Sequence, residues 1–178
     1  MHAVMRVILV GLALGLAACP VGAEEKKDRT PEMDAAARAF LKAYHAKDLD
    51  ATMEAAAAPF LVGTLRDPKV VRKGADLRAE LKSRLFTGGK LPAVVANTLT
   101  WDKAITNQLT PDEERKQRVQ LKPAIDITGA DGGYAALADN VGSAKRKQLA
   151  IAGTRLLVGI RDGKAKVVGI LVDAPLTR

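Results

Sequence analysis

Apolar positions in the first part of the chain recur at helical spacing. Between residues 30 and 47 they form one stripe, made of Met33, Ala37, Phe40, Leu41 and Tyr44. This spacing predicts an amphipathic helix that runs from Thr30 to about Lys47. Thr30 is expected to be its N-cap, because a hydroxyl followed by proline at the first helical position is a common helix start.

A second and a third helix are expected next. Asp48-Leu49-Asp50 interrupts the first pattern and caps a shorter, alanine-rich helix from about Ala51 to Ala57, which ends before Pro59. The third helix covers residues 74–85 and carries on one face Leu77, Leu81 and Leu85.

The other patterned segments predict strands and turns. Two short strands, 59–63 and 69–72, flank a turn at Asp67-Pro68. The stretch 106–114 reads as a turn or short helical cap within a long hairpin connection, and 129–133 reads as a turn. Longer strands are expected over residues 91–105, 119–127 and 134–141.

The clearest pattern lies at residues 154–172. Asp162-Gly163 stands between two apolar runs, and Asp-Gly in that setting predicts a type I′ hairpin turn. Glycine inside a strand often marks a bulge or bend, and Gly159 and Gly169 occupy such positions. A two-residue loop pairs Ile160 with Ala165, Val158 with Val167, and Leu156 with Gly169.

Residues 1–23 predict export. Arg6 precedes an uncharged apolar run from Val7 to Leu16, and small residues follow, which is typical of a secretory signal peptide. The run is too short to cross a bilayer as a helix, which needs about 20 apolar residues. The chain is therefore expected in the periplasm, in the cell envelope or outside the cell.

Two cleavage sites remain open. Leu16-Ala17-Ala18-Cys19 resembles a bacterial lipobox, and cleavage there would leave a lipid anchor on Cys19. Val21-Gly22-Ala23 equally fits an ordinary signal-peptidase site, which would release a soluble product. Residues 24–29 are expected to be a charged tether, and residues 30–174 one domain.

The composition of the chain limits the classes of binding partner that we expect. The formal net charge is +8, but the basic residues are scattered and aromatic residues make up only 3% of the chain. A platform for stacking nucleic-acid bases is therefore not expected, and membrane contact is limited to a lipid anchor or a weak attraction to anionic lipid. Cys19 is the only cysteine, and His45 is the only histidine outside the signal segment, so no metal or cofactor is expected.

Three segments resemble the nuclear transport factor two-like superfamily, also called SnoaL-like. Residues 39–50 are similar to its first-helix signature, with an aromatic residue followed by a Lys-Asp-x-Asp break. Residues 71–77 are similar to the start of its third helix, and residues 158–169 to its closing hairpin. The order of all three segments along the chain carries the resemblance.

The resemblance implies an α+β fold, a cone-shaped curved antiparallel sheet packed on N-terminal helices. The mouth of the cone is often an apolar pocket in that family. Some members are isomerases, cyclases or dehydratases, and others are non-catalytic binding or dimerisation modules. Fold alone therefore does not decide the function.

An enzyme in the cone would need a base and a donor for developing charge. Tyr44 lies on the apolar stripe and is expected to point inward, whereas His45 is rotated by about 100° toward the rim. Asp126 alternates with Ile125 and Ile127 and faces either solvent or the cone, depending on the strand register. The paired residues of the steroid-isomerase and dehydratase members have no match at corresponding positions.

A binding module is the preferred function. It would take a small apolar ligand or a protein partner and could form a homodimer through the outer sheet face. The residues that are candidates for contact with a ligand are Phe40, Tyr44, Met53 and Trp101. A small acid/base enzyme that uses Tyr44, His45 or Asp126 is the alternative.

Overall fold

The computed structural model describes residues 28–87, 120–137 and 153–173, together with Asp112, Arg115, Lys116 and Arg118. Several sequence-based predictions lie outside this part of the chain. They are the signal segment with Cys19, the strand over 91–105 with Trp101, and most of the connection 106–114.

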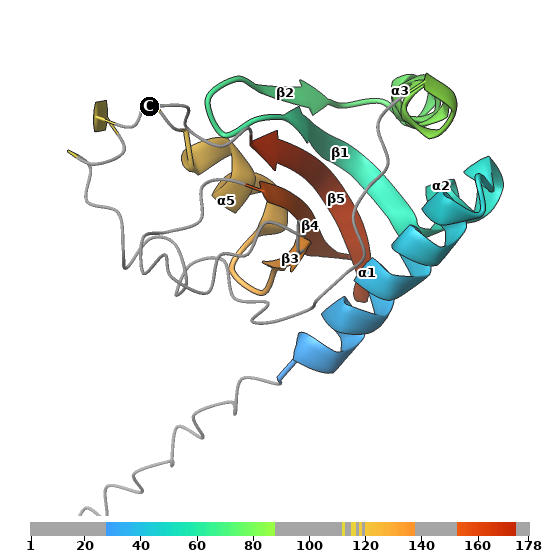
Figure 1. Ribbon diagram of the computed structural model, residues 1–178. Helices are drawn as coiled ribbons and strands as arrows, with labels where there is room; N and C mark the ends of the chain where they lie inside the picture. The colour runs from blue at the N-terminus through green and yellow to red at the C-terminus, as the bar shows by residue number, and fades with distance from the viewer. Residues whose placement is uncertain are drawn as a thin grey trace, which may run out of the picture.

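Within the described residues, five strands form one strongly bent sheet (Figure 1). Their order in the sheet is β2-β1-β5-β4-β3. The bounds are β1 Ala56–Gly63, β2 Pro68–Val71, β3 Gly133–Leu137, β4 Gly153–Arg161 and β5 Lys164–Asp173. With helices preceding the strands, this arrangement confirms the expected α+β class with a curved sheet.

The sheet is mixed rather than wholly antiparallel, which corrects the sequence-based expectation. β1 pairs with β5 in parallel, with Leu61 opposite Gly169, while the other neighbouring strands are antiparallel. A parallel pair needs a long crossover connection, and the chain between Gly63 and Lys164 supplies it. Hydrophobic periodicity does not encode strand direction, so this parallel pairing could not be predicted from the pattern of apolar residues.

Helix α1 (Thr30–His45) buries the predicted stripe, but its cap differs from the prediction. Arg29 occupies the N-cap position without a side-chain cap bond, and Thr30 is already helical. The Asp28 carboxylate accepts the Thr30 backbone N–H at 3.0 Å, and this bond lowers the pKa of Asp28 below its ordinary value. The helix therefore starts one residue earlier than predicted, and the Thr30 N–H is bonded by Asp28.

Helices α2 (Leu49–Ala55) and α3 (Gly74–Thr87) form where the sequence predicted helices, but α2 ends at Ala55 rather than Ala57, because β1 begins at Ala56 and includes Pro59. Asp48 is the N-cap of α2 and accepts the Ala51 N–H at 3.0 Å, as the Asp-x-Asp break indicated. On α3, Glu80 accepts a hydrogen bond from Arg84 at 2.8 Å, an i, i+4 pair. The buried residues of α3 are Leu77, Leu81 and Leu85.

The β4–β5 hairpin has the predicted turn. Asp162 and Gly163 have φ of 50° and 74°, as a type I′ turn requires. The predicted register holds from Arg161 to Val158, which lies opposite Val167. It then shifts by one residue, because a bulge leaves Leu157 opposite Gly169. The bulge lies beside the strand-interior glycine, where the sequence indicated it.

Residues 122–128 form a helix, so the strand predicted over 119–127 is wrong. α5 (Lys122–Thr128) has proline in its first turn and ends before Gly129, which has φ 74°. Its buried positions follow a helical period, with Leu121, Ala124 and Thr128 facing the protein. The β-branched isoleucines suggested a strand, but the proline and glycine at the two ends were the better guide.

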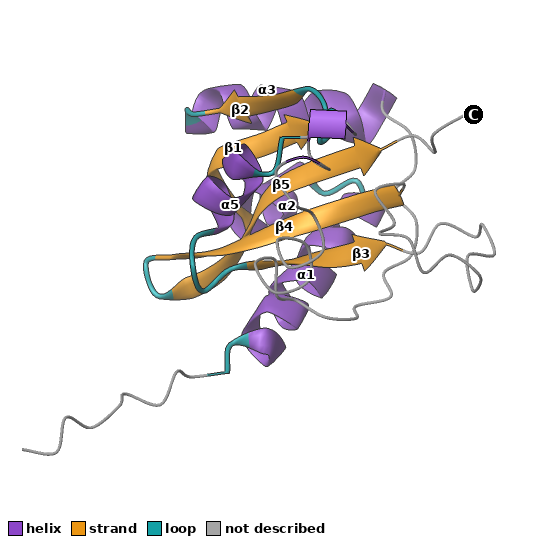
Figure 2. Ribbon diagram, turned by 90° about the vertical axis from the view of Figure 1, so that its left-hand side faces the viewer, coloured by secondary structure: helices purple, strands orange, loops and turns teal. Residues whose placement is uncertain are grey.

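Helices lie on both faces of the sheet (Figure 2). In that view α5 lies in front of the strands and α1 behind them. Leu156 and Val158 of β4 belong to a buried cluster that includes residues of α1 and α3, called the first cluster. Leu157, which lies between them in the sequence, belongs to a second cluster that includes residues of α5. α5 therefore covers part of the face that the sequence analysis offered for a dimer contact.

Arg161 joins α5 to the hairpin, and its loss is expected to destabilise the domain. The guanidinium donates to the Ile127 carbonyl at 2.5 Å and to the Ile160 carbonyl at 2.9 Å. Because Ile127 lies in the last turn of α5, Arg161→Ala leaves a helix-end carbonyl without this donor. We expect about 1–2 kcal/mol lower free energy of unfolding in urea titrations. Lys164→Ala, an exposed change at the same turn, is the control and should have almost no effect.

Candidate functional site

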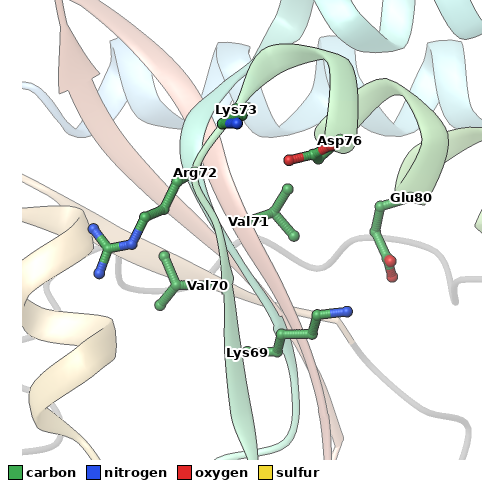
Figure 3. A pocket seen from close by; sticks show the side chains of 7 residues that line it. All are labelled: Lys69, Val70, Val71, Arg72, Lys73, Asp76 and Glu80. Carbon is green, nitrogen blue, oxygen red and sulfur yellow. The ribbon is translucent and has the colours of Figure 1, made fainter.

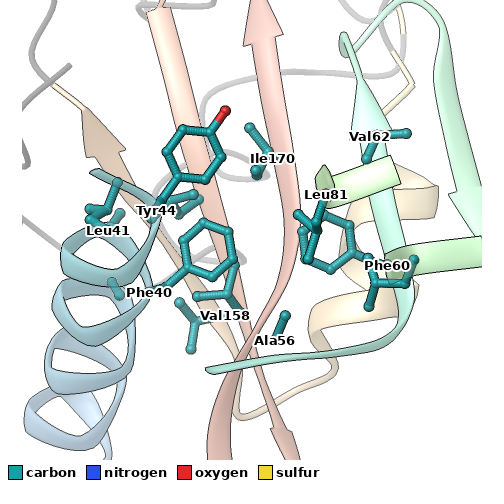
Figure 4. Packing of buried hydrophobic residues seen from close by; sticks show 14 of the residues in the cluster. Phe40, Leu41, Tyr44, Ala56, Phe60, Val62, Leu81, Val158 and Ile170 are labelled. Carbon is teal, nitrogen blue, oxygen red and sulfur yellow. The ribbon is translucent and has the colours of Figure 1, made fainter. Parts of the chain in front are cut away.

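Tyr44 lies within the first buried cluster (Figure 4). Its side chain is 7% exposed, and its hydroxyl donates to the Arg84 backbone carbonyl at 3.1 Å. The Phe40 ring stacks against it with centroids 6.0 Å apart. Burial raises the pKa of the Tyr44 phenol above its ordinary value, so the neutral form is favoured.

The structure brings together three of the predicted contact residues. Phe40 is fully buried beside Tyr44, and Met53 is partly buried against the same cluster. The fourth, Trp101, lies outside the described residues. In this part of the molecule the concave side of the sheet is filled by side chains from α1, α3 and the strands (Figure 4).

The two other acid/base candidates lie elsewhere. His45 is exposed at the last turn of α1. Its ring is nearly perpendicular to the ring of Tyr44, and the two ring centroids are 6.3 Å apart. Asp126 is exposed on α5, on the opposite side of the sheet from Tyr44, and pairs with Lys122 at 3.1 Å. The structure therefore does not gather Tyr44, His45 and Asp126 around one point.

Tyr44→Phe tests whether the hydroxyl is structural. We expect the free energy of unfolding to fall by about 1 kcal/mol, because the Arg84 carbonyl loses its donor. The raised pKa also gives a pH signature. The folded protein holds the phenolic proton more tightly than the unfolded chain, so stability is full below about pH 10 and falls as pH rises through the folded pKa. Unfolding measured from pH 8 to 11 should show a shallower decline in the variant.

Tyr134→Phe is the matched control for that experiment. Tyr134 is half-buried on β3, against the second cluster. Removing its hydroxyl should leave the alkaline decline of the parent protein in place. An equal change of slope in both variants would contradict the assignment of the decline to Tyr44.

A cleft that no sequence-based prediction included lies beside β2. Its volume is about 390 Å³, and it is lined by Lys69, Val70, Val71, Arg72, Lys73, Asp76 and Glu80 (Figure 3). Three cations within residues 69–73 were the available signal.

The described residues hold no group of three or more His, Cys, Asp or Glu side chains that could bind a metal ion. Within the same residues, every helix is too short or too polar to cross a membrane.

Helices packed into a curved sheet define the structural class of the chain, an α+β cone. No protein-family model matches it, and no curated protein does. It is similar to a crystal structure from Burkholderia xenovorans LB400, described as an NTF-2 like protein of unknown function. The identity is 16%, the match covers 85% of this chain and 91% of the other, and the TM-score is 0.41. At these values the similarity transfers no fold, site or activity to this chain.

Proposed function

We propose that this chain is a non-catalytic binding or protein-interaction module. The packing of Tyr44 is the observation that supports this proposal. Tyr44 is the acid/base candidate placed within the described core, and its hydroxyl is already used by the Arg84 carbonyl. A catalytic acid needs its proton directed at a substrate. A proton held by a backbone carbonyl supports a packing role instead.

Of the two ligand classes considered, a protein partner has the stronger support. A small apolar ligand needs an enclosed cavity, and the side chains of Phe40 and Phe60 on the concave side are 0% exposed. The cleft beside β2 is instead open and largely charged, which suits contact with another protein surface.

Native mass spectrometry of the protein purified gently from its source tests the module. We expect a stoichiometric complex with another protein. The opposite result would be a free chain that turns over small carbonyl substrates, with activity abolished in Tyr44→Phe. That outcome would favour the acid/base enzyme.

We also propose that the protein is exported, on the strength of residues 1–23. Intact-mass measurement on membrane and soluble fractions tests this and resolves the cleavage site. A diacylated species that begins at Cys19 supports a tethered lipoprotein, and a species that begins at Glu24 supports a soluble product. A mass that includes residues 1–23 would overturn the proposal.

A further inference from the structure

The cleft beside β2 follows the outer edge of a strand. Among the described strands, β2 stands at one end of the order and has β1 as its one neighbour. Val71 packs in the first buried cluster and Val70 against the second, so successive residues of β2 face opposite sides of the sheet. The cleft is lined by residues from both sides (Figure 3). A cleft reached from both faces lies along the edge of the strand rather than over one face.

The register shows which backbone groups this edge presents. The Thr64 N–H donates to the Asp67 carbonyl at 3.3 Å, which makes that pair a hydrogen-bonded one. Hydrogen-bonded and non-hydrogen-bonded pairs alternate along antiparallel strands. Val70, opposite Leu61, therefore occupies a non-hydrogen-bonded pair. Its N–H and C=O point away from β1, into the cleft.

The charges around this edge are mostly positive. Residues 66–73 contain four cations, Arg66, Lys69, Arg72 and Lys73, against one carboxylate, Asp67. The ion pairs found among the described residues involve none of these four. Glu80 on the α3 side of the cleft is already paired with Arg84. Asp76 is the other carboxylate that lines the cleft, against the three cations Lys69, Arg72 and Lys73. The charge beside β2 therefore stays net positive and suits an acidic partner.

We propose that the β2 edge binds an extended, acidic segment of a partner protein by strand addition. Backbone bonds to Val70 would align the segment, and its carboxylates would meet Lys69 and Arg72 on either side of the sheet. Strand addition at a sheet edge is a general mode of peptide recognition. This inference rests on the proposed function and names the chemistry of the partner.

The edge also has features that select against other strands. β2 is short, begins with Pro68 and carries Lys69, and such features block indiscriminate pairing. An added strand with carboxylates forms ion pairs with Lys69, whereas an uncharged strand would leave the Lys69 charge without a partner. A second copy of this chain is disfavoured, because β2 against β2 would bring the cations of both copies together.

Peptide titration followed by ¹H–¹⁵N spectra tests the proposal on the whole domain. The probe is a capped seven-residue peptide, Thr-Glu-Glu-Thr-Glu-Glu-Thr, which presents carboxylates on both faces of an added strand, and a Gln-for-Glu peptide is the charge control. A third peptide, methylated on alternate backbone nitrogens, cannot add as a strand. We expect the Glu peptide to shift the Val70 amide signal and slow its hydrogen exchange. Both control peptides should bind at least about tenfold more weakly.

Charge-matched variants locate the site. Lys69→Glu/Arg72→Glu should weaken binding of the Glu peptide about tenfold or more. Lys82→Glu/Lys164→Glu makes the same change of charge at exposed positions outside the cleft and should change binding less than about threefold at physiological salt. Circular dichroism checks that both variants fold. If a variant does not fold, binding of the three peptides to the parent protein still tests the proposal.

Three results would overturn the proposal. Equal binding of the methylated peptide would exclude strand addition, and equal loss in the two charge variants would reduce the effect to bulk charge. Absence of binding to the Glu peptide, with binding to phosphatidylglycerol vesicles through Lys69 and Arg72, would identify a membrane surface instead. In each case a partner retained in native mass spectrometry would leave the broader proposed function intact.

Discussion

Replacing Phe40 with alanine is expected to lower the free energy of unfolding by about 3–5 kcal/mol. Phe40 is 0% exposed, and its ring stacks on Tyr44 at 6.0 Å. It stands in the centre of the first cluster, between α1 and the strands (Figure 4). The substitution removes a large apolar surface and leaves a cavity that the surrounding strands cannot close. Urea unfolding followed by circular dichroism measures the loss.

Phe86→Ala is the matched control. Phe86 lies on α3 with 57% of its surface exposed. The same chemical deletion there should cost less than about 0.5 kcal/mol. Comparable losses at the two positions would mean that Phe40 is not a core residue.

Gly132→Ala is the second substitution with a large expected effect, about 2–4 kcal/mol. A Cβ at this position would lie 2.6 Å from the Val158 backbone carbonyl oxygen and even closer to that of Thr128. Both neighbours are main-chain atoms, of β4 and of the end of α5, so no side chain can rotate away. The helix and the strand must therefore separate, and thermal unfolding should report the loss.

Gly74→Ala provides the comparison for this prediction. A Cβ there meets nothing within 4 Å, and Gly74 is the first residue of α3. Alanine favours the helix, so the variant should match or exceed the parent protein in stability. A loss at Gly74 as large as that at Gly132 would point to backbone freedom rather than crowding as the cause.

Local signals in the sequence predicted local structure well. The Asp-Gly turn fixed the register of the hairpin as far as Val158, because a two-residue loop permits one pairing next to the turn. Beyond that point a bulge shifted the partner of Leu156 from Gly169 to Ile170. The glycine indicated that a bulge would occur, but packing against Leu61 decides its position, and that contact joins distant parts of the chain.

Features that depend on three-dimensional neighbours were less accessible. The identity of α5 was obscured because Ile125 and Ile127 suit a strand, while contact with the second cluster stabilises a helix. The alternation used to place Asp126 failed with it. At the candidate site, the inward direction of Tyr44 followed from helical spacing, but its bond to Arg84 needed the packing of α3 against α1.

The parallel pairing of β1 with β5 has a consequence for how the domain folds. Leu61 and Gly169 are partners although more than a hundred residues separate them. Until residues 164–173 have been synthesised, β1 has no neighbour on its inner edge, and its apolar side chains stay in water. Such non-local closure slows folding and makes it depend on the closing hairpin. Released chains truncated before residue 153 should therefore remain sensitive to protease, whereas released chains that extend past residue 173 should be resistant.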